Sequence, residues 1–133
     1  MKNLLDDNSR ESLVAYRLTR CRETLREVDY LIEGQFYNAA VSRLYYACYY
    51  AVVALLVANH IETMTHAGVK SLFSLNFVRT NRIDKDLAKT FFLLFDLRHN
   101  NDYEDYCFCD KDTIEEIRPI AGKFIDEIEK LIF

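Results

Sequence analysis

The chain of 133 residues has little glycine and proline, with three Gly and a single Pro. These two residues form most tight turns, so the sequence lacks the turns that an all-β fold of many short strands requires. Half of the residues are apolar, and a chain of this length can bury a core without disulfides or metals. The composition therefore predicts a single all-α domain over residues 1–133, built from a few long helices.

The sequence also lacks an excess of basic charge. Its net charge of −4 argues against nucleic-acid binding through overall charge alone. The charges are unevenly spread, however. Residues 36–100 hold seven basic and four acidic side chains, whereas residues 101–133 hold four basic and ten acidic ones. A local basic surface is therefore compatible with the acidic whole.

Four cysteines in a chain with this much apolar material do not indicate a disulfide framework. Cys21 and Cys48 fall at apolar helical positions, where we expect buried thiols. The pair in 107–109 has no second Cys/His pair at zinc spacing, and no helix carries a Glu-x-x-His motif, so we expect no metal. Residues 1–7 do not form a signal peptide, and the apolar run 47–58 is too short to span a bilayer. We therefore expect a cytoplasmic protein that does not bind membranes.

Hydrophobic periodicity predicts five helices. Apolar residues at spacings of three and four from Val14 to Ile32 indicate a first amphipathic helix, with Ser9 as its N-cap and Gly34 at its C′ position. The other predicted helices cover residues 36–59, 66–79, 84–100 and 112–133. Pro119 removes one intrahelical bond from the last helix and marks a place for a kink or break. We expect an antiparallel bundle of four long helices with a shorter fifth.

Five consecutive apolar residues, 91–95, give the fourth predicted helix apolar surface on every side. A single core stripe cannot cover all of them, so the run implies a second burial surface. A symmetric homodimer is the simplest source of that surface.

The first candidate site is the polar segment 98–106, which directly follows this apolar run. On a continuing helix, Arg98 and Asp102 face the same way, as do His99 and Tyr103. An arginine side chain can hold a phosphate through two parallel hydrogen bonds. The alternative is an ion pair between Arg98 and Asp102 at the helix end, which contributes little energy.

A second group of candidates comes from the helices predicted at 36–59 and 66–79. Arg43, Tyr46 and Tyr50 are spaced to share one helical face. The tyrosines are either core residues with hydroxyls that reach polar partners, or parts of a site in which Arg43 holds the 98–103 segment or a phosphate. His66 is either a cap or packing residue, or a catalytic group. There is no Walker loop, dinucleotide glycine motif or Gly-x-Ser-x-Gly motif, and we expect no cofactor.

Three segments together resemble the HEPN family, in particular its small stand-alone prokaryotic members, over residues 14–132. The first contains Ser42-Arg43-Leu44-Tyr45-Tyr46-Ala47, the second is Thr65-His66-Ala67-Gly68-Val69, and the third is Arg98 with Asp102-Tyr103. The first and third are similar to the Ser-Arg-x-Tyr-Tyr-Ala and Arg-x-x-x-Asp-Tyr patterns of one HEPN subfamily.

The resemblance implies a dimerising bundle, often paired with a nucleotidyltransferase in a toxin–antitoxin system. Active members of the family are metal-independent ribonucleases, in which an Arg holds the scissile phosphate and a His four to six residues later is the general base or acid. This sequence departs from that motif, because positions 102–104 are Asp, Tyr and Glu. Either His99, Asp102 or Tyr103 takes the role of the missing His, or the ribonuclease activity is lost.

In some systems of this family the partner adenylylates a tyrosine near the His, and the resemblance implies Tyr103 or Tyr106 as the acceptor. Two functional hypotheses follow. The chain is a homodimer acting on RNA, with two copies of Arg98 facing a cleft and with Arg43, Tyr46 and His66 binding RNA or nucleotide. Alternatively, it is an inactive module that binds a nucleotide or a nucleotidyltransferase. A plain helical interaction protein is the remaining interpretation.

Overall fold

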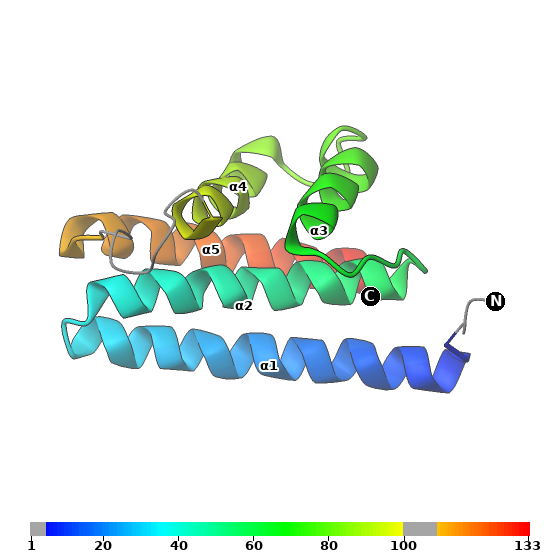
Figure 1. Ribbon diagram of the computed structural model, residues 1–133, viewed down its shortest axis with the longest axis horizontal. Coiled ribbons are helices and arrows are strands. Elements are labelled where there is room, and N and C mark those ends of the chain that lie inside the picture. The colour runs from blue at the N-terminus through cyan, green and yellow to red at the C-terminus, as the bar shows by residue number, and fades with distance from the viewer. Residues whose placement is uncertain (1–4, 100–108) are drawn as a thin grey trace.

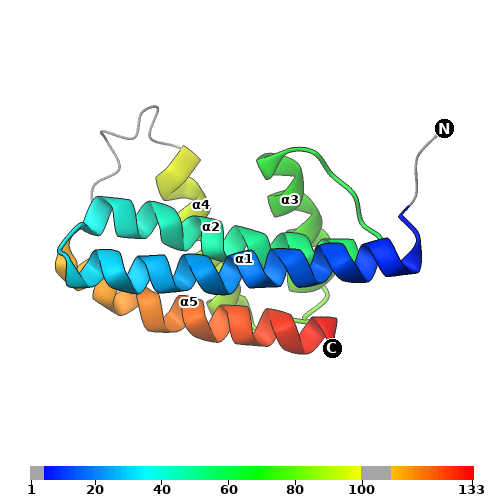
Figure 2. The same cartoon turned by 90° about the horizontal axis from the view of Figure 1, so that it is seen from below.

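The computed structural model describes residues 5–99 and 109–133, and these form helices without any strand (Figure 1). The elements in chain order are α1 (Asp7–Glu33), α2 (Tyr37–Ala58), α3 (His66–Phe73), the π-helical turn η1 (Ser74–Val78), α4 (Lys85–His99) and α5 (Lys111–Ile132). Helices α1, α2 and α5 run side by side along the long axis, whereas α3 and α4 cross α2 on one side (Figures 1 and 2). The predicted all-α bundle is confirmed.

Helix α2 is the central element, as its sequence predicts. Eleven of its residues are buried, and it contacts α1, α5, α4 and α3. Small side chains such as Ala47, Ala51 and Ala54 are fully buried and allow its neighbours to approach its backbone closely. In the described chain, α2 is also the one helix long and apolar enough to cross a membrane, but 61% of its most apolar window is buried inside the bundle. That burial is typical of a core helix.

The two ends of α1 correct the sequence-based assignment. Its N-cap is Asp6, whose carboxylate accepts a hydrogen bond from the backbone N–H of Ser9 at 2.7 Å, so the prediction of Ser9 as N-cap is wrong. Gly34 has a right-handed φ of −79°, and the left-handed conformation falls on Gln35 with φ 67°. A Cβ at Gly34 would lie 2.9 Å from the ring of Phe36, so a larger residue here would have to displace that exposed ring.

The later helix boundaries agree more closely with the prediction. The Asp84 carboxylate accepts the backbone N–H of Asp86 at 2.7 Å and caps the start of α4. Helix α5 begins slightly earlier than predicted, because Asp110 is its N-cap. It continues unbroken through Pro119. The predicted third helix changes to π geometry after Phe73, where the N–H of Arg79 bonds to the carbonyl of Ser74 five residues earlier.

The aromatic core joins α3, α4 and α5. Phe73, Phe91 and Phe124 are fully buried, with Phe91 stacked on Phe124 at 5.8 Å between ring centroids and Phe73 edge-on to both. The predicted buried thiols are confirmed, since Cys21 and Cys48 are fully buried. Burial raises the pKa of the Cys21 thiol to about 12. Both cysteines therefore behave as small apolar side chains at neutral pH.

The apolar run on α4 is mostly covered by the chain itself. Phe91, Leu94 and Phe95 are buried, and Phe92 is partly buried against the core. Leu93 remains 47% exposed. The core of a single copy therefore buries most of the apolar surface of residues 91–95, from which the homodimer was predicted. The homodimer remains a prediction, and Leu93 is the apolar side chain of this run left for it.

We expect Phe91→Ala to lower the free energy of unfolding by about 3–5 kcal/mol, because it leaves a cavity where three aromatic rings meet. Phe133→Ala is the matched control, since Phe133 is 89% exposed and should change stability by less than about 0.5 kcal/mol. Urea denaturation of the two variants measures the difference. Equal effects at the two positions would contradict the described core.

Candidate functional site

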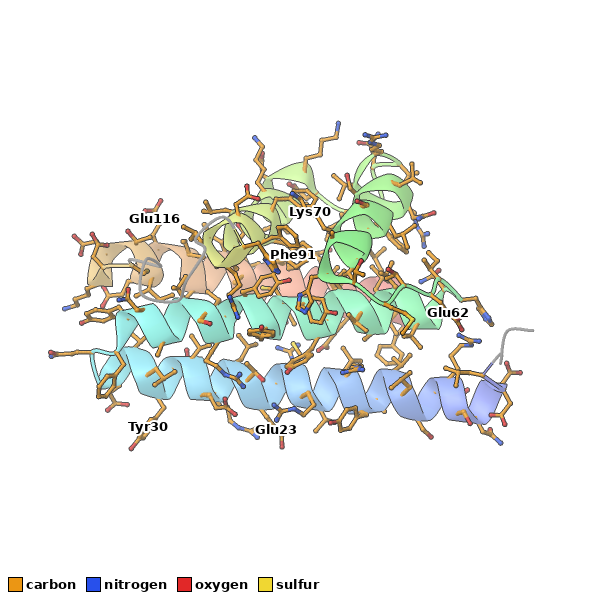
Figure 3. The ribbon with its side chains drawn as sticks, in the orientation of Figure 1. Glu23, Tyr30, Glu62, Lys70, Phe91 and Glu116 are labelled. Carbon is orange, nitrogen blue, oxygen red and sulfur yellow. The ribbon has the colours of Figure 1, made fainter. Side chains whose placement is uncertain are left out.

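The structure brings four of the sequence candidates, Tyr46, His66, Arg98 and His99, together at the junction of α2, α3 and α4. Helix α2 contributes Tyr45, Tyr46 and Tyr49, the first residue of α3 is His66, and the last two residues of α4 are Arg98 and His99. We call these six residues the His–Tyr cluster. It lies beside Phe91, whose side chain occupies the space between α4 and α2 in Figure 3, and Tyr45 stacks on that ring at 6.1 Å.

Tyr45 and His66 form the central contact of the cluster. The Tyr45 hydroxyl lies 2.8 Å from Nδ1 of His66, and the tyrosine side chain is fully buried. Burial raises the pKa of Tyr45, so its hydroxyl remains protonated. When that hydroxyl donates to Nδ1, the neutral imidazole carries its proton on Nε2. The Tyr49 ring also stacks on the imidazole of His66, with ring centroids 4.2 Å apart and an interplanar angle of 12°.

The start of α3 holds His66 in place. The Thr65 hydroxyl accepts the backbone N–H of Gly68 at 2.9 Å and forms the N-cap, so His66 occupies the first helical position. A Cβ at position 68 would overlap the Thr63 hydroxyl, so this tight entry requires a glycine. Of the roles that the sequence suggested for His66, the structure therefore assigns the cap to Thr65, whereas the His66 ring packs against Tyr45 and Tyr49.

His99 is positioned by its own helix. Its ring stacks on Phe95 at 4.1 Å, and its Nδ1 lies 2.9 Å from the carbonyl oxygen of Phe95. A carbonyl only accepts hydrogen bonds, so Nδ1 carries the proton and Nε2 has the free lone pair in the neutral ring. The centroids of His66 and His99 are 5.3 Å apart. His99 is the exposed member of the pair, so a ligand can reach its ring.

Arg98 has few polar partners among the described residues. One terminal nitrogen lies 3.5 Å from the hydroxyl of Tyr46, and the guanidinium lies 5.8 Å from the centre of that ring. Its Nε is buried and makes no hydrogen bond, and no carboxylate of residues 5–99 or 109–133 forms an ion pair with it. The alternative partner, Asp102, lies outside the described residues, as do Tyr103 and Tyr106.

Arg43 lies at the edge of the cluster and has an acidic partner. Its Nε and one terminal nitrogen donate to the same Glu27 oxygen at 3.0 and 2.8 Å. Its guanidinium is 6.0 Å from the Tyr46 ring, so Tyr46 lies near two arginines. The predicted shared face of Tyr46 and Tyr50 is confirmed, with ring centroids 6.3 Å apart.

The electrostatics of the cluster favour an anion. Burial lowers the pKa of His66, and the nearby His99 and Arg98 lower it further, so His66 is neutral at physiological pH. Arg98 then provides the permanent positive charge of the cluster, and the hydroxyl of Tyr46 lies beside it. Within the described chain, no three His, Cys, Asp or Glu side chains converge as metal ligands would.

Tyr45 and Tyr49 are the members that sequence reasoning missed. It considered the face of α2 that contains Tyr46 and Tyr50, whereas Tyr45 and Tyr49 line an adjacent face directed at α3 and α4. Their spacing of four residues was the available signal, because it predicts two rings on one side of the helix. Only the packing of α3 on α2 shows that a histidine meets them.

Comparison with known proteins agrees with this architecture. Residues 14–131 match the HEPN domain. A Thermotoga maritima protein named "UPF0332 protein" is 34% identical over 125 residues, covering 94% of this chain and 95% of that protein. A Methanocaldococcus jannaschii protein named "Putative toxin MJ0605" is 33% identical over 135 residues, covering 99% and 97%. The chain belongs to the HEPN domain family.

The lowered pKa of His66 predicts a pH dependence of stability. Above its unfolded pKa of about 6.5, both states hold a neutral ring. As the pH falls below that value, the unfolded chain takes up a proton that the folded chain does not, so the free energy of unfolding decreases until the pH reaches the lowered folded pKa.

Urea denaturation at pH 7.5 and 5.5 measures this effect, which we expect to shrink in His66→Gln. His60→Asn is the control, because His60 is exposed and its left-handed backbone suits Asn. NMR titration of Tyr45→Phe adds a second readout. Loss of a hydroxyl that bonds to the neutral ring should raise the pKa of His66. An unchanged His66 pKa in Tyr45→Phe would contradict the described bond.

Proposed function

We propose that this HEPN protein is a cytoplasmic toxin that cleaves RNA without a metal ion, and that Arg98 holds the scissile phosphate. The carrying observation is the His–Tyr cluster, in which a guanidinium and two imidazoles meet without a carboxylate among the described residues. A phosphate fits this arrangement because arginine offers two parallel donors to its oxygens. The relatives named as toxins support the biological role.

The tautomers of the cluster suggest how the chemistry is divided. The free Nε2 of His99 accepts the proton of the ribose 2′-hydroxyl. The 2′-oxygen forms a bond to phosphorus while the bond to the leaving 5′-oxygen breaks, which gives a 2′,3′-cyclic phosphate. The Nε2–H of neutral His66 and the guanidinium of Arg98 donate to the phosphate oxygens as their charge increases. In this proposal His99 replaces the histidine that the family motif has four to six residues after the arginine.

The leaving oxygen needs a proton, and a homodimer supplies it. We propose that two copies meet along α4, so that a protonated His99 from the second copy donates to the 5′-oxygen. This arrangement places two Arg98 residues at one cleft, as the sequence suggested. An antitoxin of the nucleotidyltransferase class would then act on the same face, with Tyr103 or Tyr106 as the proposed acceptor of a nucleotidyl group.

A second candidate function is binding without cleavage. Burial lowers the pKa of His66, so its ring is neutral near pH 7 and bonded to Tyr45, and it does not supply a protonated acid for the leaving oxygen. The cluster then binds a nucleotide or RNA phosphate through Arg98 and Tyr46 and does not break it. This module would act by holding RNA, a nucleotide or a nucleotidyltransferase.

Replacement of Arg98 tests the proposal. We expect Arg98→Ala to weaken binding of a short RNA by about 1.5–3 kcal/mol, roughly 10–150-fold, and to abolish cleavage. Arg98→Lys should restore little, because an ammonium lacks the planar two-point contact. Arg26→Ala is the control, since Arg26 is exposed on α1.

RNA cleavage, RNA affinity and bacterial growth upon expression are the measurements. RNA binding without cleavage by the parent protein would favour the second candidate. Parent-like cleavage and affinity in Arg98→Ala would contradict both candidates.

The homodimer has a separate test on α4. We expect light scattering to give about twice 15.7 kDa for the parent protein and about 15.7 kDa for Leu93→Arg. The variant should remain folded, because Leu93 is already 47% exposed in a single copy. Tyr30→Arg is the control, because Tyr30 is 78% exposed on α1 and points away from the bundle (Figure 3). A parent protein of 15.7 kDa at micromolar concentration would rule out the dimer.

A further inference from the structure

A hollow lies next to the His–Tyr cluster, between α1, α2 and the segment 59–65. Its volume is about 520 Å³, and Tyr49 forms part of its wall. Val53, Leu56 and Ile61 contribute apolar surface to it. The segment that closes it connects the end of α2 to α3, and Glu62 in Figure 3 marks its position. This volume falls within the range of about 300–1,000 Å³ typical of sites for small ligands.

Two arginines give this hollow a positive charge. Arg10 is 92% buried, and its terminal nitrogens donate to the carbonyls of Val57 at 2.9 Å and Leu5 at 3.3 Å. Arg17 also lines the hollow, and its guanidinium lies 5.8 Å from the centre of the Tyr16 ring. Among the described residues its buried Nε has no hydrogen-bond partner and no carboxylate forms an ion pair with it. We call this hollow the Arg17 pocket.

Among the described residues, no carboxylate is paired with the two arginines of the pocket. Glu62 is its one acidic lining residue, and it is exposed and makes no ion pair with either arginine. Arg10 is held by backbone carbonyls, which leaves Arg17 as the guanidinium available to a ligand. An apolar wall with one available guanidinium suits a molecule that is itself apolar at one end and anionic at the other.

We propose that the Arg17 pocket binds a small amphipathic anion, with an apolar body and one carboxylate or phosphate head group. The body packs on Val53, Leu56 and Ile61, and Arg17 contacts the head. This site is distinct from Arg98 and does not depend on RNA cleavage. It adjoins the cluster, because Tyr49 lines the pocket and stacks on His66 at 4.2 Å between ring centroids.

Fluorescence displacement on the full chain tests this site. The probe is anilinonaphthalene sulfonate, and the competitors are octanoate, octyl phosphate and the neutral 1-octanol. We expect octanoate or octyl phosphate to bind at least about tenfold more tightly than 1-octanol, because only they offer a charged acceptor to Arg17. The tighter of the two identifies the preferred head group.

Two variants locate the binding. Arg17→Gln should remove the advantage of the charged competitors, a loss of about tenfold or more. Arg26→Gln is the matched control, because Arg26 lies nine residues along the same helix and faces the opposite side at 100° per residue. An NMR shift of the His66 ring on addition of the tighter competitor places the ligand beside Tyr49.

Several results would overturn the proposal. These are the absence of saturable probe binding, equal affinity for 1-octanol and both charged competitors, and parent-like affinity in Arg17→Gln. The 1-octanol comparison uses the parent protein, so it decides the matter even if a variant fails to fold. The assay contains no RNA, so loss of RNA cleavage elsewhere leaves its outcome unaffected.

Discussion

The burial of α2 is the constraint on which the rest of this structure depends. The helix is packed against α1 and α5 along its length, and α3 and α4 cross it on a further side. Small residues such as Ala47 and Ala51 permit this close approach. The tyrosines of the His–Tyr cluster lie at the seam where α3 and α4 cross α2, and they contact His66 and His99 there. Polar groups along that seam must find partners in place of water. The bond between the Tyr45 hydroxyl and His66 meets that requirement.

Burial also determines the protonation of the cluster. It raises the pKa of Tyr45 and lowers that of His66, so both groups are neutral and each fits the other as donor and acceptor. His99 is exposed and bonded to the carbonyl of Phe95, which directs its free lone pair away from its own helix. Two histidines 5.3 Å apart therefore have different environments, and their roles can differ for that reason.

The arginines differ in their partners. Several at the outer faces form ion pairs, such as Arg22 with Glu129 and Arg118 with Asp29, and such exposed pairs contribute little to stability. Arg17 and Arg98 have no carboxylate partner among the described residues, and both lie near the tyrosines of α2. Unpaired guanidiniums beside aromatic rings are a feature of sites that bind anions. The local partners of Arg17 and Arg98, and not the net charge of the chain, are therefore the basis on which we propose that they bind anions.

The sequence alone determined the helices, the central place of α2, the buried thiols and the family, because these follow from hydrophobic spacing and from motifs along the chain. It also indicated Arg98, His99, His66 and Tyr46, each from a local pattern. The tertiary structure decided which of these side chains meet. The Tyr45–His66 bond joins residues 21 positions apart, and the pairing of Arg43 with Glu27 joins two helices. Such contacts depend on how helices cross, which no periodicity within a single helix specifies.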